Sequence, residues 1–141
     1  MTKLQVSIDV IIHATEDINK FFESFNEMFG LEKEDFTTAH VSGHFDNPIV
    51  TLSIKLSKKE ALKFLDKFLE EISENQKNEI IDQIEERTEH STMYLRLDKQ
   101  EFVNGKIKFN EREAIRLKIH TPIYNKKDTF KVFSEIFQKV N

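Results

Sequence analysis

The chain has 141 residues, of which 38% are hydrophobic and 33% charged, with a formal net charge of −4 and no cysteine. This composition predicts one globular domain, residues 1–141, with a substantial core, and it excludes disulfides and thiolate metal sites. No apolar run reaches the roughly 20 residues of a membrane helix, and the N-terminus lacks a signal-peptide pattern. The sequence therefore predicts a cytoplasmic protein without a membrane partner.

The first part of the chain predicts a strand, a helix and a hairpin. Residues 3–13 alternate between apolar and polar side chains, which is typical of a strand with one buried face. Thr15 is expected to cap the following helix, which ends at Gly30. Residues 36–42 and 49–56 then predict an antiparallel hairpin.

The middle of the chain is predicted to be helical. Ser57 and Glu60 have the spacing of a capping box, and apolar residues then recur at helical spacing as far as Ile72. A shorter helix is expected to follow, with Ile80 and Ile84 buried. Its acidic side is interpreted as a solvated face.

A third group of strands is predicted after these helices. Residues 92–98 alternate strictly between apolar and polar side chains. Asn104 and Gly105 form a strong turn signal, so a further strand is expected at 106–109. The polar residues that follow the first of these strands are consistent either with ligand contact or with hydrogen bonds that fix the next turn.

A last strand at 114–123 and a helix capped by Asn125 complete the predicted order β-α-β-β-α-α-β-β-β-α. The final helix is expected to bury Phe130. Runs of adjacent strands imply a mostly antiparallel sheet, and helices with one apolar stripe each most simply cover one face of it. The predicted fold class is therefore α+β, a single mostly antiparallel sheet with helices packed on one face.

The other face of such a sheet is expected to stay open and basic. Alternation places thirteen polar residues on it, of which seven are Lys, Arg or His. Single-stranded RNA is bound by a positive groove and by planar groups on which bases stack. Together with lysines at a helix start and polar residues at a strand end, the candidate RNA-binding residues are Tyr94, Arg96, Lys99, Gln100, Lys106, Lys108, Arg116, Lys118, His120, Lys126 and Lys127.

The charge of the chain is unevenly distributed. Residues 1–65, 66–89 and 90–141 carry net charges of −3, −6 and +5, so the last third could attract RNA despite the negative total. The predicted helix starts at 57–59 and 125–127 each add two lysines where phosphate could bind. An ordinary solvated sheet surface, or an interface with a partner, would also explain the open face.

Catalysis finds little support in the sequence. His40 and His44 have the spacing of metal ligands on a helix, but Gly43 lies between them and no helix is expected there. With three glycines in all, the chain contains no phosphate-binding loop, nucleophile elbow or dinucleotide fingerprint. We therefore expect no enzyme activity, no metal and no cofactor.

Three segments carry a resemblance to a known family. The turn 43–49, the entry 13–16 and the run 95–100 are together similar to the archaeal predicted exosome-associated RNA-binding proteins, over roughly residues 3–140. This resemblance implies a fold like that of the large-subunit ribosomal protein that binds 5S RNA, and an RNA-binding role. Asp46 stands where the family usually has glycine, and aspartate tolerates positive φ better than most residues.

Residues and resemblance together predict a non-catalytic RNA-binding protein, accessory to RNA processing or degradation. The alternative is a protein-interaction or scaffold module without direct RNA contact, either a homo-oligomer such as a homodimer or a subunit of an RNA-processing complex. The alternation of the later strands favours the first function only if their basic residues gather on one surface.

Overall fold

The structure is a computed structural model that describes residues 3–42 and 48–138, so the expected turn at 43–47 lies outside the described residues. The strands are β1 (Gln5–His13), β2 (Thr37–Ser42), β3 (Pro48–Ser57), β4 (Thr88–Glu89), β5 (Thr92–Asp98) and β6 (Ala114–His120). The helices are α1 (Ile18–Phe29), α2 (Lys59–Glu71), α3 (Glu74–Asp82), α4 (Ile84–Arg87), α5 (Lys99–Val103) and α6 (Thr129–Phe137). Short 3-10 turns lie at Lys33–Asp35 and Lys126–Asp128.

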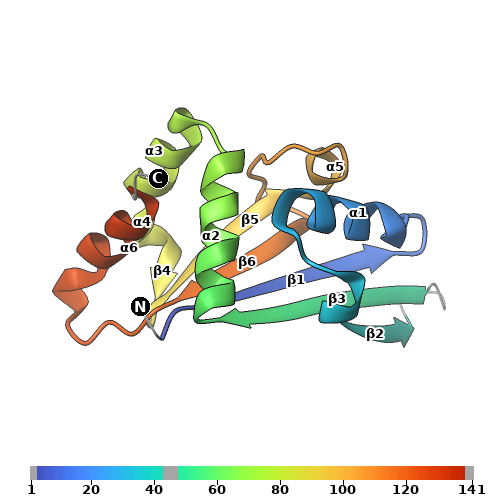
Figure 1. The fold of residues 1–141 in the computed structure, drawn as a ribbon, viewed down its shortest axis with the longest axis horizontal. Helices are drawn as coiled ribbons and strands as arrows, with labels where there is room; N and C mark the ends of the chain where they lie inside the picture. The colour runs from blue at the N-terminus through green and yellow to red at the C-terminus, as the bar shows by residue number, and fades with distance from the viewer. Residues whose placement is uncertain (1–2, 43–47, 139–141) are drawn as a thin grey trace.

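The six strands form one sheet in the order β2-β3-β1-β6-β5-β4, and every neighbouring pair is antiparallel. The helices lie on one side of this sheet, and α2 crosses in front of the strands (Figure 1). The α+β fold with one open sheet is therefore confirmed. None of the helices in the described residues is long and apolar enough to cross a membrane.

Strand alternation separates the core from the open face. In β1, Val6, Ile8 and Val10 are at most 2% exposed, whereas the residues between them keep partial exposure. The same alternation holds in β5 and β6, where Leu95 and Leu117 are buried. Because alternate side chains of a strand point to opposite faces, these buried residues all lie under the helices.

A phenylalanine cluster joins three helices above the sheet. The ring of Phe102 in α5 lies 4.6 Å from that of Phe25 and 6.3 Å from that of Phe29, both in α1. Phe29 in turn lies 4.6 Å from Phe64 of α2. Tilted and stacked aromatic pairs at such distances add to the energy of burial. The short helix α5 is therefore fixed by side-chain packing.

The first helix begins later than Thr15 would place it. Asp17 is the N-cap of α1, and its side chain accepts a hydrogen bond from the amide of Asn19 at 3.0 Å. The expected end is confirmed, because Gly30 adopts a left-handed conformation with φ of 69°. A carboxylate two residues further along has thus replaced the hydroxyl as the cap.

The expected capping box at the start of α2 is wrong. Ser57 still belongs to β3, where it lies opposite Gln5 of β1. The N-cap position is occupied by Lys58, which has φ of 53° and makes no side-chain cap hydrogen bond. The pairing of the strand thus keeps the serine hydroxyl away from the helix amides.

The segment after β5 also differs from the prediction. The side chain of Asp98 accepts a hydrogen bond from the amide of Glu101 at 2.9 Å and caps α5. Gly105, with φ of 82°, follows this helix. Residues 106–109, expected to form a strand, make only an isolated bridge between Leu97 and Phe109. Capping by Asp98 starts helix α5 at a point where the sequence predicted that strand 92–98 leads into a hairpin.

Acid is expected to destabilise the protein partly through Asp98. The hydrogen bond from the Glu101 amide, and next the one from Asn110, hold the pKa of Asp98 below its ordinary value of 3.8. Because the folded pKa is lower than the unfolded one, this stabilisation is present above the unfolded pKa and is lost as pH falls through the folded pKa. Urea denaturation in neutral and in strongly acid solution should show a smaller acid-induced loss of unfolding free energy for Asp98→Asn than for the wild type. Equal losses would assign the acid sensitivity to other carboxylates.

The last helix begins after a 3-10 turn. Asn125 accepts a hydrogen bond from the amide of Lys127 at 3.1 Å, so it caps this turn as expected of a helix start. Phe130, in the first turn of α6, is 45% exposed, against the prediction, while Phe133 and Phe137 further along the helix are buried.

Candidate nucleic-acid interface

The sheet register sets the positions of the open-face side chains. Three rows cross β1, β6 and β5: Asp9, Arg116 and Arg96; Ser7, Lys118 and Tyr94; and Gln5, His120 and Thr92. Successive residues on one face of a strand are separated by about 6.6 Å. Five of the predicted RNA-binding residues, Tyr94, Arg96, Arg116, Lys118 and His120, are thus brought together on neighbouring positions.

Two arginines face one another at one end of this surface. Arg96 of β5 and Arg116 of β6 are directly opposite in the register, and like charges in that position destabilise a sheet. Arg96 is partly compensated by Glu111, whose carboxylate lies 4.0 Å from its Nε. The side chain of Arg116 is exposed and has no hydrogen bond or ion pair within residues 3–42 and 48–138. Its guanidinium group is therefore available to an anion.

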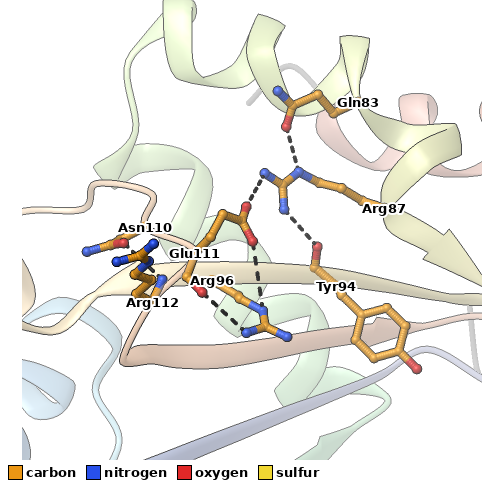
Figure 2. Close-up of polar contacts among 7 residues, drawn as sticks. All are labelled: Gln83, Arg87, Tyr94, Arg96, Asn110, Glu111 and Arg112. Carbon is orange, nitrogen blue, oxygen red and sulfur yellow. Dashed lines mark hydrogen bonds and ion pairs between the residues drawn. The ribbon is translucent and has the colours of Figure 1, made fainter.

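Glu111 links the sheet to the helical layer, and it lies between two guanidinium groups (Figure 2). Its carboxylate lies 2.9 Å from Nη2 of Arg87, and the Nε of Arg87 donates a hydrogen bond to Gln83 at 2.6 Å. The Nη1 of Arg96 also donates to the main-chain oxygen of Glu111, at 3.4 Å. These contacts orient Arg96 before any ligand is bound.

An aromatic ring lies in the next row. The Nζ of Lys118 is 6.0 Å from the centre of the Tyr94 ring, which is a cation-π distance. Tyr94 is 41% exposed, so part of its ring is accessible. In the third row, Nδ1 of His120 lies 3.0 Å from Oγ1 of Thr92. The Tyr94 ring offers a surface on which a base can stack, and the Lys118 ammonium group offers a positive charge beside it.

A hollow of about 560 Å³ indents the open face where β1 ends and β6 begins. The residues that line it are Asp9, Ile11, His13, Thr51, Arg96, Lys99, Glu113, Ala114, Arg116 and Lys118. The carboxylate of Asp9 accepts a hydrogen bond from Ser53 at 2.8 Å. His13 and Glu113 approach within 3.9 Å at the rim. Within the described residues, no group of three or more His, Asp or Glu side chains is arranged to hold a metal ion.

The structure assigns Lys99 an internal role in place of the expected RNA contact. It is 6% exposed, and its Nζ donates to the oxygen of Ile11 at 2.5 Å and to Glu16 at 2.7 Å. Burial raises the pKa of Glu16, but the hydrogen bonds from the His13 amide and from Lys99, with the charge of Lys99, outweigh it and leave the pKa below its ordinary value. The pair joins the end of β1 to the starts of α1 and α5.

The remaining predicted residues lie away from the three rows. Lys106 and Lys108 are exposed in the segment after α5, and Lys108 lies 3.7 Å from Glu101. Gln100 is exposed on α5. Lys126 and Lys127 are exposed in the 3-10 turn before α6. The Asn125 side chain and main-chain oxygen occupy amides of that turn, which leaves few for a phosphate.

Sequence reasoning did not assign a role to the hollow. Ile11 is an apolar residue on the polar side of an otherwise alternating strand, and it is 42% exposed. A single exposed apolar side chain is common on protein surfaces and does not by itself mark a contact surface. Ile11 is notable because it lines the same hollow as Asp9 and Arg116. Asp9, two positions earlier, was expected only as part of the open face.

Among the residues that the structure describes, no helix covers this sheet face, which carries two facing arginines and an exposed aromatic ring. RNA-binding proteins hold their ligand on surfaces of this kind. A family model described as RNA binding matches residues 5–121. The chain therefore belongs to this RNA-binding family. This confirms the coarser part of the resemblance described above.

Individual relatives are similar over most of the chain. An uncharacterised protein of Methanocaldococcus jannaschii is 29% identical over 128 residues, which cover 83% of this chain and 86% of the relative. A Pyrococcus abyssi protein that is named as an RNA-binding protein is 28% identical over 116 residues, or 78% of this chain and 75% of its own length. Among solved structures, a protein of Archaeoglobus fulgidus is similar with a TM-score of 0.79 and 26% identity, over 94% of this chain and 97% of that one.

Proposed function

We propose that this chain binds RNA on its open sheet face and performs no chemistry on it. The observation that carries the proposal is the position of Arg116, which has no partner in the described residues and lies opposite Arg96. A hydrogen-bond acceptor of RNA between the two guanidinium groups, whether a phosphate or the acceptor edge of a base, would replace their repulsion by two charge-assisted interactions. Membership of the RNA-binding family and the name of the Pyrococcus relative support RNA as the ligand.

The surface suits unpaired RNA better than a duplex. Unstacked bases can lie on the exposed part of the Tyr94 ring, whereas the bases of an A-form helix are already stacked on one another. Along β6, Lys118 adds a second positive charge beyond Arg116, and the His120 side chain follows on the same face. With one aromatic residue in the three rows, stacking alone confers little sequence preference, and backbone contacts carry most of the affinity.

The resemblance to exosome-associated proteins suggests where such binding is used. In our proposal the protein is a cytoplasmic, single-domain accessory factor that presents RNA to a processing or degrading complex. Its fold would correspond to that of the ribosomal protein that binds 5S RNA. Copurification with the subunits of an RNA-degrading complex, before and after nuclease treatment, tests whether the association exists and whether it depends on RNA.

The affinity for RNA is expected to fall steeply with salt. With three to five phosphates neutralised by the open face, raising monovalent salt about fourfold should weaken single-strand binding about 20- to 100-fold, because bound counterions are released. Fluorescence anisotropy of a labelled single-stranded RNA over a salt series measures this slope. An affinity that does not change with salt would show that the basic rows do not contact phosphates.

A protein-interaction function has its own support in the edge strand β2. The described side chains of this strand, residues 37–41, are exposed and contain no Lys, Arg, Asp or Glu, and Val41 is 54% exposed. An uncharged edge strand can pair with a strand of a partner or of a second copy. A stable homodimer in solution combined with no RNA binding at low salt would favour this scaffold function over RNA binding.

A further inference from the structure

The lining of the hollow on the open face includes two apolar side chains, a carboxylate and a guanidinium group. Ile11 is 42% exposed and, together with Ala114, gives the hollow an apolar part. Asp9 and Arg116 are directly opposite each other on β1 and β6, and both line the same hollow. Small-molecule sites combine apolar surface with a few convergent polar side chains. In this hollow most of the lining is polar or charged, and Ile11 and Ala114 supply the apolar surface.

The carboxylate of Asp9 is not explained by contact with the RNA backbone. It adds a negative charge next to Arg116 and would repel a phosphate. It accepts a hydrogen bond from Ser53 at 2.8 Å and lies in none of the ion pairs of the described residues. An ionised carboxylate has two oxygens and about four acceptor positions, so Asp9 keeps the capacity to accept further hydrogen bonds. In RNA the donors are the N–H groups of bases and the ribose 2′-hydroxyl groups, and a base can present two N–H donors side by side.

The pairing of an acid with an arginine selects among the bases. Guanine donates from N1 and N2 side by side, which matches the two oxygens of a carboxylate, whereas uracil offers one N–H. Arginine binds the adjoining O6 and N7 acceptors of guanine in a bidentate manner. Residues opposite each other on antiparallel strands have Cα atoms about 4.5–5.5 Å apart, so Asp9 and Arg116 can reach these two adjacent edges of one base.

We propose that the hollow binds an unpaired guanine base of the RNA, with Asp9 at N1 and N2, Arg116 at O6 and N7, and Ile11 under the ring. This inference rests on the proposed RNA-binding function and adds a base preference to it. Arg96 and Lys118, which also line the hollow, remain for the flanking phosphates.

The test uses short uridine oligomers of about eight nucleotides in which one central position is changed. Replacing that uridine by guanosine should tighten binding about tenfold or more, as one bidentate contact does. Inosine, which lacks the N2 amine, and 7-deazaguanosine, which lacks the N7 acceptor, should each lose most of this gain. Fluorescence anisotropy competition gives all four affinities on one scale.

Two isosteric variants then assign the preference to Asp9. Asp9→Asn keeps the shape of the side chain and an acceptor for Ser53 but turns one oxygen into a donor, so the preference for guanosine should vanish without a loss of affinity for the uridine oligomer. Asp82→Asn removes the same charge from an exposed position at the end of α3 and should leave the preference unchanged.

The outcomes separate this inference from the function on which it rests. Equal affinity for the uridine and guanosine oligomers would overturn the guanine site and leave RNA binding intact. Absence of binding to every oligomer at low salt would overturn both. A guanosine preference that survives in Asp9→Asn would show that Asp9 does not recognise the guanine base. Displacement of the guanosine oligomer by an equal concentration of free guanosine monophosphate would overturn the assignment to RNA.

Discussion

Replacing Arg116 by glutamate is expected to weaken RNA binding about 100-fold or more, roughly 3 kcal/mol of binding free energy. The change removes the guanidinium group that has no partner within residues 3–42 and 48–138, and it places a second carboxylate beside Asp9. The remaining cations of the face would then have to bind phosphate next to two negative charges. Anisotropy titrations at low ionic strength measure the loss.

A charge-matched control distinguishes a local effect from a change in net charge. Lys63 is exposed on α2, in the layer of helices, and Lys63→Glu changes the charge by the same amount. Its effect on affinity should be small, since exposed charges separated by more than about 10 Å are largely screened. If Arg116→Glu binds RNA like the wild type, the open face is not the RNA site. If it instead dissociates a dimer on gel filtration, the protein-interaction function is favoured.

Replacing Phe102 by alanine is expected to destabilise the fold by about 3–5 kcal/mol. Phe102 is fully buried, and its ring lies within 6.5 Å of the rings of Phe21, Phe25 and Phe29. The truncation leaves a cavity between α5 and α1, and a domain of ordinary stability loses a large part of its free energy of unfolding. Urea denaturation followed by circular dichroism gives the difference from the midpoint and slope.

Phe130→Ala is the matched control for this substitution. Phe130 is the same residue type but is 45% exposed at the start of α6, and surface substitutions usually change stability by about 0.5 kcal/mol or less. Similar losses for both variants would mean that Phe102 does not anchor α5. A lower slope for Phe102→Ala, with an unchanged midpoint, would instead indicate a changed denatured state.

The strands could be predicted because their alternation is local. In β1, β3, β5 and β6 every second residue is apolar, and the structure buries most of these residues under the helices. The prediction that helices cover one face followed from the order of the elements, and it placed Arg96, Arg116 and Lys118 on a common surface. The register that puts Arg96 opposite Arg116 depends on which strands become neighbours, and alternation alone does not determine that order.

The errors arose where two local signals competed. At 98–101 the acceptor Asp98 and the later Glu101 have the spacing of a helix start, but the turn signal at Asn104 and Gly105 favoured a direct hairpin. The chain satisfies both signals by inserting α5 before the turn. Ser57 shows the reverse case, in which strand pairing with Gln5 overrides a capping pattern.

The exposed cations of the candidate site could be predicted from the sequence, but the buried contacts beside it could not. At a strand end, Lys99 was consistent with ligand contact or with hydrogen bonds that fix the next turn. It instead pairs with Glu16 and with the oxygen of Ile11, which are more than eighty residues away in the chain. No pattern over neighbouring residues reports such a contact. Lys106 and Lys108 were placed on the open face only because a strand was expected at 106–109, and without that strand their positions are set by the bridge at Phe109.

The division of each strand into a buried set and an outward set also bears on how such a protein can diversify. Substitutions at Val6, Ile8 or Leu117 must respect the volume available under the helices, whereas those at the intervening positions leave the scaffold unchanged. Ligand preference can therefore drift from one descendant to another by single replacements of outward residues. A lineage could acquire a new nucleotide preference through these positions while its fold stays the same.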